Sequence, residues 1–137
     1  MAFPTVRGAV ALGKAGEHIA MSAFTQYDYK CALANLEACD IILFDDDGTP
    51  LRVEVKAASE TQQGGQRYRF MTCKGSKTKR MISTDDADLI CYVALDMRRI
   101  CVRPMTSVTH KRTTVLREDF LVPEQKQIRL AIREARR

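Results

Sequence analysis

The chain lacks the features that would place it in a membrane or in a disulfide-stabilised, secreted class. Among its 137 residues no apolar run approaches the roughly 18 residues that a membrane-spanning helix needs, since even the stretch 87–95 contains Asp88. Residues 1–7 carry no apolar segment after a basic start, so we expect no secretion signal. The five cysteines are odd in number and never form a CxxC pair, which argues against a disulfide framework and a zinc knuckle. We therefore expect a cytoplasmic protein in a reducing compartment, with no membrane association.

Histidine is also scarce, and acidic residues are outnumbered by basic ones. The two histidines, His18 and His110, are far apart in the sequence, and neither lies near a cysteine at metal-ligand spacing. Lysine and arginine together number 22 against 17 aspartates and glutamates, which leaves a formal net charge of +5 and a pI near 9.1. This balance favours a polyanion as the partner, although charge alone assigns no function.

The order of apolar patterns predicts one α+β domain around a mixed sheet of about five to six strands. Apolar residues at helical spacing predict a first helix over about 8–24, and Pro123 near a first turn predicts a last helix that ends at Arg137. The expected strands cover residues 27–33, 40–44, 51–56, 68–73, 87–95 and 100–103. We expect a single domain, 1–137, with its core at about 8–104 and a C-terminal helical extension at about 113–137.

The segment 40–56 has the pattern of a β-hairpin around an acidic, glycine-containing turn. Pairing Phe44 with Pro50 across the turn places Asp40 directly opposite Glu54 on the same face. A shift of one residue would move Asp40 to the other face, so this expectation depends on the register.

Asp40, Glu54 and Lys56 are the candidate catalytic residues. Side chains alternate across a strand, so Lys56 shares a face with Glu54. Facing carboxylates repel, and Mg²⁺, which takes one or two carboxylates together with waters and phosphate oxygens, removes the repulsion. A lysine beside them supplies positive charge near phosphoryl oxygens and can orient or deprotonate an attacking water. The set suits metal-assisted phosphodiester hydrolysis; the alternative is a surface ion pair worth under about 1 kcal/mol.

With the first helix included, these residues resemble the PD-(D/E)XK nuclease superfamily. The matching motifs are Gly13-Lys14-Ala15-Gly16-Glu17, Cys39-Asp40 and Glu54-Val55-Lys56. Their order is most similar to small intron-encoded homing endonucleases and archaeal Holliday-junction resolvases of that superfamily. The resemblance implies a restriction-endonuclease-like α/β/α fold and a Mg²⁺-dependent DNA endonuclease, with Mn²⁺ as a substitute metal. It also implies that Asp40, Glu54 and Glu17 hold the metal, and that these three and Lys56 form the catalytic set. We expect no nucleotide cofactor.

Two loops are candidates for contacting DNA. Four positive charges fall within seven residues, at Lys74, Lys77, Lys79 and Arg80; a solvated surface loop is the alternative. Around Gly64-Gly65 lie side chains of the types that bind base edges in the major groove: Gln62, Gln63, Gln66 and Arg67. This second cluster favours a site-specific, homing-type duplex endonuclease. A branched-DNA resolvase of the same fold and a non-cleaving DNA-binding module remain as alternatives.

Three further expectations concern the oligomeric state, a second acidic cluster and the genetic context. Cutting both strands of DNA calls for two sites, so we expect a homodimer or a homotetramer. The acidic cluster of Asp85, Asp86 and Asp88 lacks a paired lysine and predicts a solvated turn. The sequence leaves open whether the gene belongs to a host or to a phage or another mobile element.

Overall fold

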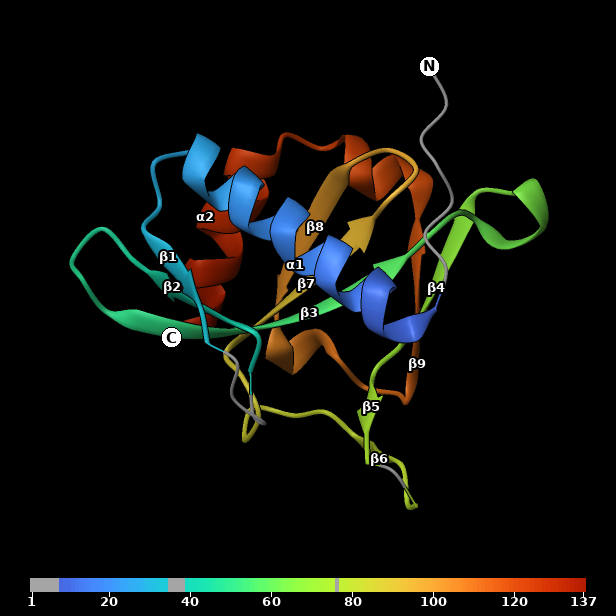
Figure 1. Cartoon of the computed structure of the whole chain (residues 1–137). Coiled ribbons are helices and arrows are strands. Elements are labelled where there is room, and N and C mark those ends of the chain that lie inside the picture. The colour runs from blue at the N-terminus through green and yellow to red at the C-terminus, as the bar shows by residue number, and fades with distance from the viewer. Residues whose placement is uncertain (1–7, 35–38, 76) are drawn as a thin grey trace.

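The computed structural model describes residues 8–34, 39–75 and 77–137 of the chain (Figure 1). The expectation about a secretion signal concerns residues 1–7, which lie outside the described residues. Ser76 of the basic loop lies outside them as well. The elements follow one another as α1 (Ala9–Gln26), β1 (Cys31–Leu33), β2 (Ile41–Phe44), β3 (Pro50–Ala58), the 3-10 turn η1 (Gln62–Gly64), β4 (Arg67–Met71), β5 (Cys73–Lys74), β6 (Arg80–Met81), β7 (Leu89–Ala94), β8 (Arg99–Pro104), η2 (Met105–Ser107), β9 (Arg112–Leu116), η3 (Arg117–Leu121) and α2 (Glu124–Ala135).

Five of these strands form the central sheet, in the order β1-β2-β3-β7-β8. β3 and β7 pair in parallel, and the other neighbours pair antiparallel. The α+β class and the mixed sheet predicted from the sequence are therefore confirmed. Among the described helices, none is long and apolar enough to cross a membrane.

Both helices pack against one face of this sheet. Side chains from α1 and α2, including Phe24 and Ile128, join one buried cluster with Val53 and Val55 of β3. α1 comes especially close to β3 at Gly16, where an added Cβ would lie 2.7 Å from the Cβ of Ala57. A glycine is needed here because two backbones approach more closely than side chains allow.

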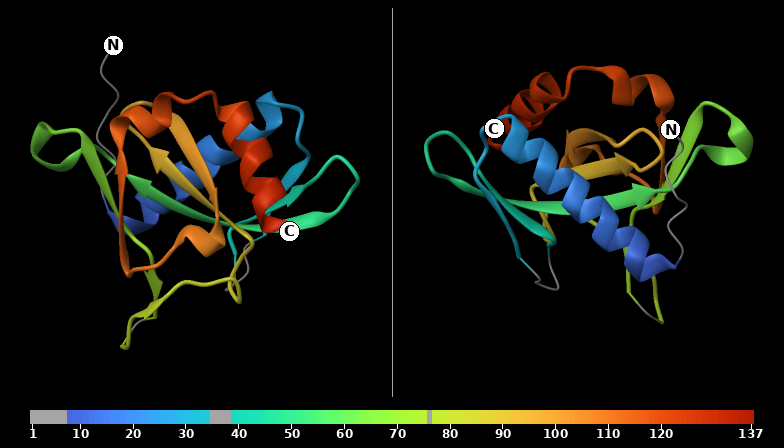
Figure 2. Two further views of the ribbon diagram at one scale, coloured as in Figure 1. Left: turned by 180° about the vertical axis from the view of Figure 1, so that it is seen from behind. Right: turned by 45° about the horizontal axis from the view of Figure 1, so that its top comes forward.

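The opposite face is covered by a two-stranded ribbon of β4 and β9, together with the 3-10 turns η2 and η3 (Figure 2). The ring centroids of Tyr68 and Phe120 are 5.0 Å apart, which joins β4 to η3, and those of Phe70 and Tyr92 are 4.8 Å apart, which anchors the ribbon to β7. The expected α/β/α layering is therefore wrong in its second layer. The helical extension predicted from about residue 113 is also wrong at its start, because β9 occupies Arg112–Leu116 and α2 begins only at Glu124.

Candidate active site

The β2–β3 hairpin has the register that the sequence predicted. Phe44 pairs with Pro50, and Ile41, the first residue of β2, pairs with Val53. Glu54, the next residue of β3, therefore has no partner within β2. Asp40 lies just before β2, and its backbone N–H donates to the carbonyl oxygen of Val53 at 3.0 Å. β3 therefore runs on past its neighbour and leaves a notch at the edge of the sheet.

Asp40 is held in this notch by the backbone of β3. Its Oδ2 accepts a hydrogen bond of 2.8 Å from the N–H of Val55. The carboxylate takes the place that the next residue of β2 would occupy in the ladder. One oxygen of Asp40 is thereby fixed, which orients the whole group beside Glu54.

Glu54 is the most deeply buried charged side chain of the site, with 6% of its side-chain surface exposed. Burial raises the pKa of Glu54, and the charge of Asp40 raises it further, against the opposing effects of Lys74 and Lys56. Its Oε2 is fully buried and makes no hydrogen bond of good geometry. Its compensation comes instead from ion pairs, because a buried charge is tolerated only when it is paired.

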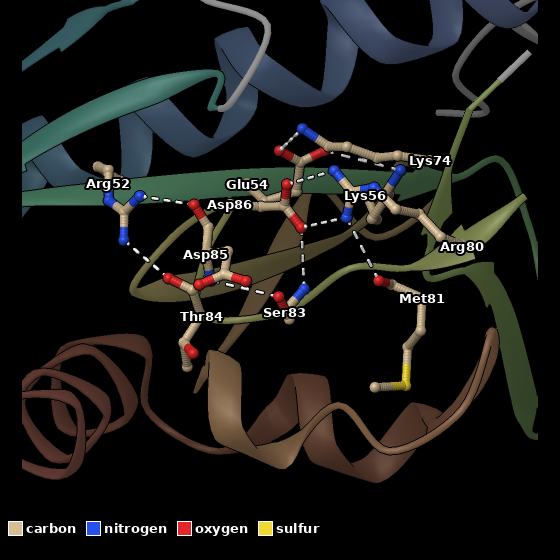
Figure 3. Close-up of polar contacts among 10 residues, drawn as sticks. All are labelled: Arg52, Glu54, Lys56, Lys74, Arg80, Met81, Ser83, Thr84, Asp85 and Asp86. Carbon is tan, nitrogen blue, oxygen red and sulfur yellow. Dashed lines mark hydrogen bonds and ion pairs between the residues drawn. The ribbon is translucent and has the colours of Figure 1, made fainter.

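Two lysines supply these ion pairs (Figure 3). Lys56 Nζ lies 3.7 Å from Glu54 Oε1, and Lys74 Nζ lies 3.0 Å from Glu54 Oε2. Lys56 follows from the alternation of β3. Lys74 comes from β5 and was expected to contact DNA from a loop, so its place on Glu54 was not anticipated. A lysine that precedes a glycine in a loop does not by itself indicate an ion pair with a buried glutamate.

Glu17 lies within electrostatic reach of the site but does not join it directly. Burial raises the pKa of Glu17, and the charge of Asp40 raises it further, against Lys14 and His18. Neither a hydrogen bond nor an ion pair links Glu17 to another described residue. Its expected role as a metal ligand stays a prediction.

The acidic cluster after β6 begins in a turn with Asp85 exposed, as expected, but the expectation of solvation is wrong for Asp86, which is buried, and for Asp88, which is partly buried. Asp86 is buried and forms a two-pronged contact with Arg80, at 2.7 and 2.9 Å, which lowers the pKa of Asp86 to about 2. Asp88 accepts hydrogen bonds from the backbone and the guanidinium of Arg52. Arg52 also donates to the carbonyl oxygens of Thr84 and Asp85. These contacts fasten the segment before β7 alongside the carboxylates.

The residues predicted to contact DNA are distributed over two places. Lys77 and Lys79 are exposed between β5 and β6, whereas the Arg80 guanidinium is engaged with Asp86. The other group is exposed on η1 and at the start of β4, at the end of β4 remote from β5: Gln62, Gln63, Gln66 and Arg67.

The carboxylates fit a divalent cation of the magnesium type. Within the described part of the chain, no three His, Cys, Asp or Glu side chains gather into a complete metal-binding group. Magnesium needs only one or two carboxylates when waters and phosphate oxygens complete its shell. Asp40 and Glu54 meet that requirement, and the buried Glu54 Oε2 has a lone pair beyond the one that faces Lys74 Nζ at 3.0 Å. A cation bound there competes with Lys74 for the same oxygen.

Comparison with solved structures shows which class of fold this is. The chain is similar to the bacterial homing endonuclease I-Ssp6803I, with a TM-score of 0.72 over 95% of this chain and 97% of that chain. The sequences are 11% identical, so the likeness concerns the fold. No protein-family model and no curated protein matches the sequence. The chain is thus an α+β protein with the fold of a bacterial homing endonuclease.

Proposed function

We propose that the chain is a magnesium-dependent DNA endonuclease whose site consists of Asp40, Glu54 and Lys56. The observation that carries this proposal is the notch beyond β2, where one carboxylate is fixed by Val55 and the other is buried beside a lysine. The fold of a bacterial homing endonuclease supports it independently of the sequence motif.

Each residue of the proposed site has its own role. Asp40 and Glu54 hold the cation, with Glu17 assisting from α1. The cation supplies Lewis-acid activation of the phosphodiester and of the attacking water when it is bound. Lys56 Nζ donates to a non-bridging phosphate oxygen, where negative charge increases in the transition state, and orients the water. The buried position of Glu54 excludes bulk water and strengthens each of these electrostatic contacts.

The proposed enzyme is site-specific, of the homing type, and cuts duplex DNA as a homodimer or homotetramer. Two sites are needed to cut two strands, which a symmetric assembly provides. Sedimentation equilibrium measures the assembly. A competition between a four-way junction and random duplexes at near-physiological salt separates this enzyme from a resolvase.

Nicking of supercoiled plasmid tests the activity itself. We expect nicking with Mg²⁺ or Mn²⁺ and none with EDTA. Asp40→Asn, Glu54→Gln and Lys56→Ala should each lower the rate by about 10²- to 10³-fold or more, with folding retained. Asp46→Asn and Lys126→Ala change exposed residues away from the site and serve as matched controls. Wild-type rates in any of the three site variants would exclude this site. Binding without nicking under any divalent metal would identify a non-cleaving DNA-binding module instead.

A further inference from the structure

The outward face of the β4–β9 ribbon carries an unusual set of side chains. β4 alternates strictly, so Tyr68 and Phe70 are buried while the residues between them are exposed. The outward cross-strand pairs are Arg67 with Leu116, Arg69 with Thr114, and Met71 with Arg112. All six of these side chains are exposed.

The charges on this face are of one sign. Arg67, Arg69 and Arg112 make no ion pair with a carboxylate among the residues that the structure describes. Arg67 and Arg69 are neighbours on one face of β4, and Arg69 lies diagonally across from Arg112. Diagonal neighbours lie within reach of each other's long side chains, so the like charges of Arg69 and Arg112 repel. A polyanion laid on the face would relieve this repulsion.

The ribbon also has the shape and the chemistry to bind base edges. The major groove of B-DNA is about 12 Å wide and admits a two-stranded ribbon, whose strands are about 4.8 Å apart. Arginine donates to guanine, and apolar side chains contact the thymine methyl group. Met71 and Leu116 are 49% and 37% exposed, so this face offers apolar as well as cationic groups.

The ribbon is joined directly to the candidate site. β4 ends at Met71, and three residues later Lys74 contacts Glu54. Thr72 N–H also donates to the carbonyl oxygen of Lys111, next to Arg112, which ties the start of β9 to the same end. At the far end lies η1 with its exposed glutamines, and Figure 1 shows this loop projecting beyond the ribbon.

We propose that the β4–β9 ribbon enters the major groove of duplex DNA and supplies the sequence specificity of the proposed endonuclease, through Arg67, Arg69 and Arg112. This inference rests on the proposed function. An extended chain spans about 10 Å between Met71 and Lys74, and the length of β4 adds about 13 Å more. At 3.4 Å per base pair, the bases that the ribbon contacts lie about three to seven base pairs from the cut.

The test measures DNA binding in Ca²⁺ or EDTA, separately from nicking. Wild-type protein is selected against duplexes with a randomised centre, and we expect an enriched sequence. The variant with Arg67, Arg69 and Arg112 all changed to alanine should bind this sequence more weakly, by about 5- to 100-fold for each arginine that contacts a base, with a shallower salt dependence. The corresponding triple lysine variant keeps the charge. It should retain affinity for random duplexes but lose sequence preference, because lysine cannot form the two-pronged contact to guanine.

The matched control changes Lys126, Arg129 and Arg133 to alanine. These residues are exposed on α2, which packs against the opposite face of the sheet, and their loss removes the same charge. Methylation of guanine N7 should interfere with binding at about three to seven base pairs from the cut. Equal weakening in both triple variants, or equal binding of duplex RNA, would overturn the ribbon assignment while plasmid nicking persists. Absence of both DNA binding and nicking in the wild type would overturn the proposed function as well.

Discussion

Lys74 Nζ lies 3.0 Å from Glu54 Oε2, so the β5–β6 hairpin contributes a cation to the centre of the candidate site. Lys56 contacts the other oxygen of the same carboxylate. The two lysines balance the charges of Asp40 and Glu54 in the protein without metal. Three segments that are distant in sequence therefore meet at one buried glutamate.

The first prediction concerns competition between Lys74 and a metal ion. Lys74→Met should tighten the binding of Mn²⁺ in the absence of DNA, because a competing cation leaves Glu54 Oε2. The same change should weaken DNA binding, because a positive charge near the bound phosphate is lost. Titration calorimetry with Mn²⁺ measures the first effect, and fluorescence anisotropy with labelled duplex measures the second.

Lys79→Met is the control for this prediction. It removes the same charge from an exposed position of the same loop. Its Mn²⁺ affinity should match that of the wild type. Equal Mn²⁺ affinity for Lys74→Met and the wild type would show that Lys74 does not compete for the site.

The second prediction follows from the raised pKa of Glu54. An acid whose pKa is higher in the folded state favours folding when it is protonated, so stability is full below its unfolded pKa of 4.5 and decreases as the pH rises from there through the higher folded pKa. Metal-free wild-type protein should lose stability over this window and then level off. In Glu54→Gln this part of the pH dependence should disappear. Urea unfolding at a series of pH values with EDTA measures it, and an unchanged slope would contradict the assignment.

The third prediction concerns Asp86, whose pKa is lowered from 3.8 to about 2, mainly by Arg80. An acid with a lowered folded pKa stabilises the protein above its unfolded pKa, and this stability is lost as the pH falls from about 4 to about 2. Asp86→Asn should therefore cost about 1 to 2 kcal/mol at neutral pH, a value reduced by the solvent exposure of Arg80. The loss should vanish near pH 2. Asp85→Asn, in an exposed neighbour, should change little.

The fourth prediction compares two glycines of α1. Gly16→Ala should destabilise the protein by about 1–3 kcal/mol, because its Cβ would meet Ala57 at 2.7 Å. Gly13→Ala should stabilise it by about 0.5–1 kcal/mol, because a Cβ there meets no atom within 4 Å and alanine favours the helix. Denaturant unfolding of both variants gives the free energies. Effects of the same sign would contradict the close approach of α1 to β3.

Local patterns in the sequence were sufficient to predict the hairpin that positions Asp40 and Glu54. The acidic turn limits the register, and the alternation of Val53 and Val55 with Glu54 and Lys56 assigns each face. Hydrophobic periodicity likewise placed both helices to within a few residues of their observed ends.

β9 could not be predicted in the same way. Its five residues contain two threonines and an arginine, and only Val115 is buried, so the segment has almost no apolar alternation of its own. It becomes a strand because β4 offers unpaired backbone groups beside it, about forty to fifty positions earlier in the chain. The second covering layer of the sheet depends on this long-range pairing.

Lys74 and Asp86 likewise have partners that the sequence does not indicate. A lysine in a glycine-containing loop and an aspartate before a strand are both solvated by default in sequence. The fold buries Glu54 and Asp86, and a buried carboxylate requires a cation, so Lys74 and Arg80 are drawn to them. The sequence by itself determined which groups can perform the chemistry and which strand face carries them. Tertiary structure alone decided which cations stand against the buried carboxylates, because desolvation arises only when distant segments pack together.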